Sequence, residues 1–368
     1  MPLTPFALIM PVQTKVLFLL PYPLGSAPSQ RFRVENFLPL LDDSGIAWDT
    51  ASFMDDATRR IFYKPGNIHL KLFGILKGLC RRVRHVWQAR RYNWIFIHRE
   101  AAPLGPPVFE WVLTKVLGKR VIFDFDDAIW MPDSSRNGLL SRILKWHSKT
   151  GSICRWASKV SGGNDYLCNY ARQQGAKTVI RIPTVVDTKR RYNRIKHHHA
   201  GQLIIGWTGS YSTLVYLNSL VPFLQILEQK IDFEFLVIAD RDPKLPLKRQ
   251  RFIKWNELSE VDDLLNIDIG VMPLPDDSWA KGKCGFKIIQ YLSVGIPAVA
   301  SPVGVNSVII ENEINGFLCD GVDWVNCLKI LAEDVELRSK LGLKGREKIV
   351  NFYSLDSQYQ PFLSLFNM

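Results

Sequence analysis

The chain has 368 residues, about two to three times the length of a typical domain, so two domains are expected. Its composition, 47% hydrophobic and 22% charged, excludes a disordered or fibrous protein. The net charge of +12 is uneven, because residues 1–200 carry 31 basic and 14 acidic side chains and residues 201–368 carry 16 and 21. This asymmetry predicts two domains with different partners. The basic half favours an anionic one: nucleic acid, an acidic membrane surface or a phosphorylated substrate.

The sequence also bears on the compartment. No uncharged apolar run approaches the ~18–20 residues that span a bilayer. Residues 1–14 lack basic side chains and are interrupted by prolines, so a secretory signal is not expected. The six cysteines are scattered without a Cys-x-x-Cys pair, which is typical of free thiols in a reducing compartment. We therefore expect a cytoplasmic protein.

The first half alternates strands with helices. Continuous apolar runs predict strands that are buried on both faces of a parallel sheet, at residues 16–20, 94–97, 121–123, 160–161 and 179–180. Helical patterns lie between most of them, at residues 31–41, 107–117 and 165–174. Alternation of this kind indicates an open α/β sheet.

The segment 187–200 is basic and nearly free of apolar residues, and it predicts an interdomain linker. Its run His197–His199 is expected to be solvated, with weak metal binding as the alternative. The α/β pattern then restarts, with strands expected at residues 203–206, 233–239, 267–272 and 297–300 and helices at 214–229, 284–294 and 335–352.

The expected architecture is thus two doubly wound Rossmann-like domains, residues 1–188 and 200–352, facing each other across a ligand cleft. Residues 353–368 are expected to pack back on the first domain. Neither half has the Gly-x-Gly-x-x-Gly fingerprint of a dinucleotide site, and a Walker loop is absent.

The stretch Gly282–Ser301, which reads GKCGFKIIQYLSVGIPAVAS, resembles the donor-binding motif of retaining glycosyltransferases of the GT-B fold, family 4. Further segments resemble the family in the same order along the chain, at residues 180–187, 206–210, 311–317, 345–346 and 353–354. The resemblance covers most of the chain. It implies a GT-B enzyme that transfers a sugar from a nucleotide-sugar donor with retention, and it does not identify the sugar.

The donor side of the site is expected around one helix start. Lys283 and Lys287 lie just before and on its first turn, where the helix N-terminus favours an anion, so both are assigned to the donor diphosphate. The resemblance implies that Gln290 contacts the nucleotide ribose, although the family usually has Glu there, and the family's earlier Glu is replaced by Gly282. Gly209 and Ser210 are expected to hold a phosphate, with an ordinary helix cap as the alternative for Ser210.

The acceptor is expected on the first domain. The loop with Ser26, Arg31 and Arg33 follows the first strand, and His98 ends another, so these residues are acceptor candidates; surface charge and a structural histidine are the alternatives. Asp124, Asp126 and Asp127 follow a further strand. The resemblance places Asp126 where the family has a His near the transferred sugar, so Asp126 is a catalytic candidate with Lys287, and Asp127 an acceptor contact.

Three readings of these carboxylates stay open: an acceptor-hydroxyl contact, a base, or a metal site, besides a helix cap at Asp127. The resemblance implies no metal and no cofactor. The expected acceptor is a glycan or a lipid-linked acceptor of cell-envelope polysaccharide or glycolipid synthesis. The alternatives are a non-catalytic GT-B binding or scaffold protein, a GT-B epimerase or phosphorylase, and a nucleic-acid-binding protein. No nucleic-acid-binding motif supports the last of these.

Residues 71–91 carry seven basic side chains and no acidic one. Leu72, Leu76, Leu79, Val83 and Val86 recur there at helical spacing. Such a basic amphipathic helix is typical of a membrane-surface element, and core packing of one face is the alternative. The segment predicts contact with an anionic membrane surface at the inner face of the membrane.

Overall fold

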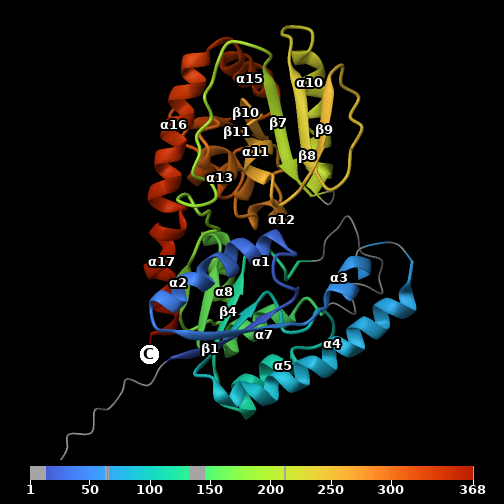
Figure 1. Cartoon of the computed structure of the whole chain (residues 1–368), viewed down its shortest axis with the longest axis vertical. Coiled ribbons are helices and arrows are strands. Elements are labelled where there is room, and N and C mark those ends of the chain that lie inside the picture. Colours follow the sequence, from blue (N-terminus) through green and yellow to red (C-terminus); the bar gives the residue numbers. More distant parts are fainter. Residues whose placement is uncertain (1–13, 63, 65, 132–145, 211–212, 368) are drawn as a thin grey trace, which may run out of the picture.

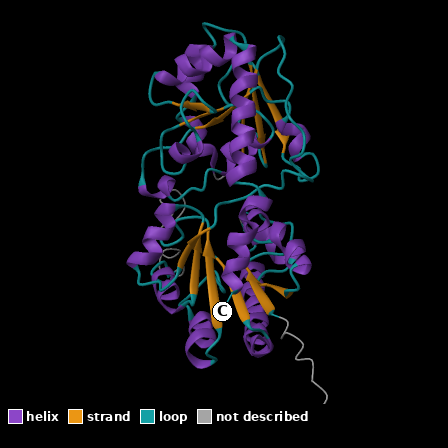
Figure 2. Ribbon diagram, turned by 90° about the vertical axis from the view of Figure 1, so that its left-hand side faces the viewer, coloured by secondary structure: helices purple, strands orange, loops and turns teal. Residues whose placement is uncertain are grey.

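The computed structural model describes residues 14–62, 64, 66–131, 146–210 and 213–367. They form two α/β domains, one above the other in Figure 1, and each contains a six-stranded parallel sheet. The strand order is β2-β1-β3-β4-β5-β6 in the first sheet and β9-β8-β7-β10-β11-β12 in the second. In each domain the strands that directly follow the first one extend the sheet to one edge, and the later strands extend it to the opposite edge. The predicted pair of doubly wound sheets is confirmed, and helices lie on both sides of the strands (Figure 2).

The strands of the first sheet are β1 (Lys15–Leu20), β2 (Ala47–Ser52), β3 (Trp94–His98), β4 (Arg120–Phe125), β5 (Lys159–Gly162) and β6 (Val179–Arg181). The helices of this half are α1 (Pro28–Arg33), η1 (Glu35–Phe37), α2 (Leu38–Asp43), α3 (Asp56–Phe62), α4 (Ile68–Gln88), η2 (Ala89–Arg91), α5 (Val108–Trp111), η3 (Val112–Val116), α7 (Lys149–Trp156) and α8 (Asp165–Gln173). The central strands β1, β3 and β4 are buried on both faces, which explains their continuous apolar sequences.

Two expectations for this half need correction. The helix expected at residues 31–41 is broken, because the backbone leaves the helical conformation at Val34, between α1 and η1. The helix expected at 107–117 is a four-residue α5 that continues as the π-helical η3. Strand β2 escaped prediction because it is an edge strand with a mostly half-buried, partly polar sequence.

The strands of the second sheet are β7 (Ile204–Gly209), β8 (Glu234–Ala239), β9 (Gln250–Lys254), β10 (Ile269–Met272), β11 (Ala298–Ala300) and β12 (Gly316–Leu318). Its helices are α9 (Leu214–Asn218), α10 (Val221–Leu227), α11 (Glu260–Leu264), α12 (Ser278–Lys281), α13 (Phe286–Ser293), α14 (Asn306–Ile309), α15 (Asp323–Glu333) and α16 (Val335–Phe352), followed by α17 (Leu355–Leu363) and η5 (Ser364–Phe366). The helix expected at 214–229 is two helices, since Pro222 occupies the first turn of α10, where a missing N–H costs little. Edge strands β9 and β12 were not predicted.

The chain crosses between the domains twice, after β6 and again at the junction of α16 and α17. Helix α17 packs on the first sheet, where the ring of Phe362 stacks on that of Phe37 with centroids 4.1 Å apart. The basic segment 187–200 lies between β6 and β7 and is only partly solvated, since His197 and His199 are exposed and other residues are not. Tyr192 is fully buried, and Lys196 and the buried His198 both lie within ion-pair distance of Asp268. None of the described helices is both long and apolar enough to cross a membrane.

Candidate functional site

The carboxyl ends of the two sheets face each other, and three cavities lie there. The largest has a volume of about 620 Å³ and lies mainly against the second domain. A cavity of about 130 Å³ lies between the domains, and one of about 260 Å³ lies mainly against the first. Asp127, which follows β4, lines all three. Lys283 lines the first two and Trp279 lines the first and third, so the three cavities share walls.

The start of α13 forms the cationic wall of the site. The residue before the helix, Gly285, has a φ of 66°, a conformation that glycine adopts without strain. Lys287 lies in the first turn, with its Nζ over the Trp207 ring at 5.2 Å from the centroid. A Cβ on Gly209 would lie 2.5 Å from the Trp207 ring and 2.9 Å from Cε of Lys287, so the glycine makes room for both side chains. The structure therefore brings two of the predicted donor residues together.

The charge of Lys287 is poorly compensated. Among the described residues no carboxylate forms an ion pair with it. Burial, together with the nearby charge of Lys283, lowers the pKa of Lys287 to about 7, although Asp127 opposes the shift. An anion placed beside Lys287 would relieve this cost, so the lysine is suited to bind a diphosphate.

Lys283 is paired across the domain boundary. Its Nζ lies 3.2 Å from Oδ2 of Asp127 and 5.2 Å from the centroid of the Trp279 ring. Burial would lower the pKa of Lys283, but the charge of Asp127, its hydrogen bond to Lys283 and the nearby Tyr216 together raise the pKa. A predicted donor residue and a predicted acceptor residue are thus in direct contact.

The remaining donor candidates are placed differently. Ser210 is exposed, and its carbonyl accepts hydrogen bonds from the backbone N–H and the hydroxyl of Thr213, a residue that lines the largest cavity. Gln290 is 3% exposed and lines none of the three cavities. Its amide donates to the hydroxyl of Tyr192 over 2.9 Å, so it lies in the core beneath the site instead of in the cavity.

Asp126 is held by a residue that sequence reasoning did not single out. Arg99 donates from Nε to Oδ1 of Asp126 over 2.8 Å, and its backbone has a φ of 63°, in the left-handed region that is costly for a residue other than glycine. Burial would raise the pKa of Asp126, but the charges of Arg99 and His98 keep it below its ordinary value. Asp126 is therefore an anionic side chain. It is suited to accept a hydrogen bond from a hydroxyl and poorly suited to act as a base.

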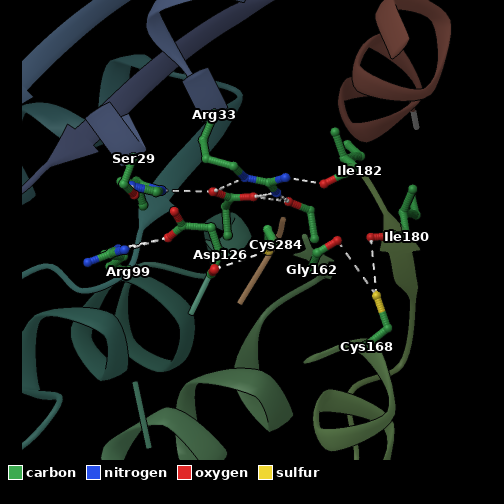
Figure 3. A network of polar contacts seen from close by, with 12 residues as sticks. Ser29, Arg33, Arg99, Asp126, Gly162, Cys168, Ile180, Ile182 and Cys284 are labelled. Atoms are coloured by element: carbon green, nitrogen blue, oxygen red, sulfur yellow. Dashed lines mark hydrogen bonds and ion pairs between the residues drawn. The ribbon is translucent and has the colours of Figure 1, made fainter. Parts of the chain in front are cut away.

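Arg33 and His98 are buried and line none of the three cavities. Figure 3 shows Arg33 within a network of polar contacts that also includes Ser29 and Asp126. His98 bonds through Nδ1 to Asp124 over 2.8 Å and through Nε2 to the Ser29 hydroxyl over 2.9 Å. Arg33 pairs with Asp124 and donates to the carbonyl of Ile182. Arg33 is 1% exposed and His98 is 0% exposed, so neither is placed to touch an acceptor as predicted. Their side chains bond to Asp124, and His98 also bonds to Ser29, which lines the cavity of about 130 Å³.

Arg31 also has a different place from the one expected. Its guanidinium donates to both carboxylate oxygens of Glu260 over 2.9 Å and pairs with Glu257, so it links α1 to the second domain. Glu260 in turn accepts from Tyr192, whose hydroxyl is bonded to Gln290. Ser26 donates to the carbonyl of Pro23 and lines none of the three cavities. Arg31 therefore connects the domains, and neither Arg31 nor Ser26 lines one of the three cavities.

A metal site at the aspartates is not supported by the geometry of the part of the chain that the structure describes. Asp124 faces Arg33 and His98, Asp126 faces Arg99, and Asp127 faces Lys283. No group of three or more potential ligands gathers among the described residues. The positive charge that a metal would bring to these carboxylates is supplied by side chains.

The sequence matches no protein-family model and no curated protein. Solved structures, in contrast, are similar over nearly the whole chain. Sucrose-phosphate synthase from Thermosynechococcus elongatus has a TM-score of 0.68 and 15% identity, covering 96% of this chain and 98% of that one. HepE from Anabaena, solved with UDP-glucose, has a TM-score of 0.65 and 13% identity, covering 95% and 98%. The lipopolysaccharide outer core galactosyltransferase WaaB has a TM-score of 0.63 and 13% identity, covering 96% and 99%. The chain has the GT-B fold of these proteins.

Proposed function

We propose that this protein is a glycosyltransferase that moves a sugar from a nucleotide-sugar donor to a glycan or a lipid-linked acceptor, with retention at the anomeric carbon. The observation that carries the proposal is the lysine pair at the start of α13, which faces anionic side chains of the other domain across the cleft. A donor diphosphate needs fixed positive charge and backbone N–H groups, and this helix start offers both. HepE, which shares the fold, was solved with UDP-glucose and with UDP.

In this proposal Lys287 and Lys283 bind the diphosphate, and Gly209 keeps the backbone of β7 close to it. The lysines stabilise the charge that develops on the leaving diphosphate as the bond to the sugar breaks. Asp127 binds a hydroxyl of the acceptor and Asp126 one of the transferred sugar. Their carboxylates supply positioning, which converts an encounter of two substrates into a reaction within one complex.

Retention needs either a carboxylate nucleophile or attack from the same face as the leaving group. Asp126 is bound by Arg99, which lowers its nucleophilicity, so we favour same-face attack, in which a donor phosphate oxygen takes the acceptor proton. The reaction proposed here needs no metal ion and no cofactor. We place it in the cytoplasm at the inner face of the membrane, in cell-envelope polysaccharide or glycolipid synthesis.

A second candidate is a GT-B protein that binds a nucleotide sugar or glycan without catalysis. It is favoured by Gln290, which lies in the core where the family has a ribose-binding Glu, and by Gly282 in place of the earlier Glu.

The test is a panel of UDP-, GDP- and dTDP-sugars, since a donor that binds only the native state raises its melting temperature. Nucleoside diphosphate release is then followed for each donor that binds. A binder that releases no nucleoside diphosphate with any glycan or lipid-linked acceptor supports the second candidate. A protein that no nucleotide sugar stabilises contradicts both.

A further inference from the structure

We infer that helix α4 is a docking face for an anionic lipid bilayer and that it presents the cavity beside Asp127 to acceptors carried by that bilayer. The inference that α4 docks on a bilayer is argued from the surface of the first domain alone. The inference that the bilayer carries the acceptor rests on the proposed function.

Helix α4 is anchored by one face only. Gly74 packs on Thr58 and Gly78 on Phe53, at distances that leave no room for a side chain. Arg82 is fully buried and donates to the carbonyls of Leu20, Ala51 and Ala101. The helix is therefore fixed against the ends of β1 and β2, and its outer face is presented in one orientation.

The outer face of α4 is apolar. Five large side chains lie there, each between 52% and 67% exposed: Leu72, Phe73, Leu76, Val83 and Trp87. The spacing of Leu72, Leu76, Val83 and Trp87 sets four of them in one stripe along the helix. The apolar residues predicted for this helix are thus divided between two faces, since Leu79 and Val86 pack inward. Helix α5 packs against α4 (Figure 1), and Val108, Trp111 and Val116 of α5 and η3 are also exposed.

The charge around the stripe is positive. Of the seven basic residues in 71–91 only Arg82 is turned fully inward, and Arg84, Arg90 and Arg91 are exposed. Lys77 and Arg81 share the carboxylate of Asp55, which neutralises one charge of the two. A rigid helix with an apolar stripe and basic flanks matches the interface of an anionic bilayer, which takes up apolar side chains beneath phosphate groups. A nucleic acid would satisfy the basic residues and leave Leu, Val and Phe without a partner.

The docking face adjoins the site. Helix α3 packs against α4, and its Phe62 lines the cavity of about 260 Å³. The walls of this cavity combine apolar side chains, among them Met54, Leu104, Ile129 and Met131, with the charged side chains of Arg99, Glu100, Asp127 and Lys149. An acceptor with an apolar carrier and a sugar or hydroxyl head fits this arrangement, because the carrier would lie along apolar walls while the head meets Asp127.

Flotation of the full chain with vesicles tests the docking face. We expect binding to phosphatidylcholine vesicles that contain about one third phosphatidylglycerol and little binding to phosphatidylcholine alone. The combined substitutions Leu72→Ser, Leu76→Ser and Val83→Ser should reduce binding about tenfold or more. The matched control, with Val322→Ser, Ile330→Ser and Leu343→Ser on the second domain, should bind like the wild type, because these exposed apolar residues lie away from α4.

The inference is overturned if the wild type does not bind the anionic vesicles at low salt, or if the control variant loses as much binding as the serine variant. It is also overturned if Arg84→Gln combined with Arg90→Gln weakens vesicle binding and the serine variant binds like the wild type. Retention of a nucleic acid or a protein partner, with no vesicle binding, also overturns it. Nucleotide-sugar binding, read as a thermal shift, is measured on the same samples. A serine variant that loses vesicles and keeps the shift separates failure of the docking face from failure of the proposed function.

Discussion

The ammonium group of Lys283 lies 3.2 Å from Oδ2 and 3.3 Å from Oδ1 of Asp127, so an ion pair joins the second domain to the first across the cleft. The two partners belong to opposite sides of the proposed reaction. A donor diphosphate that binds Lys283 competes with Asp127, and its arrival frees the carboxylate for an acceptor hydroxyl. In the proposed reaction, the contact therefore predicts that the donor binds before the acceptor.

The variant Asp127→Asn tests this competition. It removes a charge that competes with the diphosphate, so UDP-glucose or the matching donor should bind several-fold more tightly, by up to about tenfold. Sugar transfer should fall about tenfold or more because the acceptor loses a charge-assisted hydrogen bond. Titration calorimetry measures the first effect and nucleotide release the second. Asp276→Asn is the control, since Asp276 also lines the largest cavity but pairs with Lys281. Unchanged or weaker donor binding in Asp127→Asn would contradict the account.

The pKa of Lys287, lowered to about 7 by burial and by Lys283, predicts pH-dependent donor binding. Below pH 7 the lysine is charged and binds the diphosphate without taking up a proton. Above pH 7 binding must first protonate it, so the Kd should rise by up to about tenfold per pH unit until the higher pKa of the complex is reached. UDP-glucose suits the measurement because its diphosphate does not titrate in this range. Lys287→Arg should give a flat profile, since arginine stays charged. A flat profile in the wild type would refute the assignment.

The hydrogen bonds of Gln290 account for a glutamine at this position instead of a glutamate. Its amide donates to the Tyr192 hydroxyl, which donates to Glu260, and a glutamate at position 290 has no proton to give. Gln290→Glu would bury a second carboxylate near Glu260, so we expect a loss of about 1–3 kcal/mol in the free energy of unfolding and no gain in activity. Gln225→Glu, at an exposed amide of the same domain, should change stability by less than about 0.5 kcal/mol. A more stable or more active Gln290→Glu enzyme would show that Gln290 is not a donor in this network.

The buried ion pair of Arg33 and Asp124 should be essential for the first domain. Asp124→Asn leaves the Arg33 charge buried without its counter-charge, so the free energy of unfolding should fall by about 3–5 kcal/mol. Ser161→Ala removes one hydroxyl from the same network and should cost about 1 kcal/mol. Chemical denaturation followed by tryptophan fluorescence compares the two. If both variants lost similarly little free energy of unfolding, the ion pair would not be the main stabilising interaction of this network.

The sequence alone predicted the strands that are buried on both faces, because their burial requires a continuous run of apolar residues. Strands β1, β3 and β4 are buried on both faces and read as continuous apolar runs, whereas the edge strands β2 and β9 are partly polar and half-exposed and gave no comparable signal. Helix α13 was predicted at residues 284–294 because a glycine directly after a helix is a local pattern, and the structure has this helix at Phe286–Ser293.

Charge pairing could not be predicted. Arg33 and Asp124 are 91 residues apart, and Arg31 and Glu260 are 229 residues apart. Which cation pairs with which carboxylate depends on how the strand ends and the two domains are arranged in space. The spacing of residues along the chain does not reveal that arrangement. For this reason Arg31, Arg33 and His98 were expected to face a ligand although they bind other side chains, and Arg99 was not expected at all. Its position next to His98 at a strand end was the only available signal.

The most direct test of the central claim, that the lysines at α13 bind a nucleotide-sugar donor, is turnover of the identified donor by the wild type and by Lys287→Ala. The substitution removes a half-buried cation without a carboxylate partner among the described residues, so the melting temperature should be unchanged or higher. Donor turnover should fall about 100-fold or more, because charge stabilisation of the leaving diphosphate is lost. Near-normal turnover by a correctly folded Lys287→Ala enzyme would contradict the account.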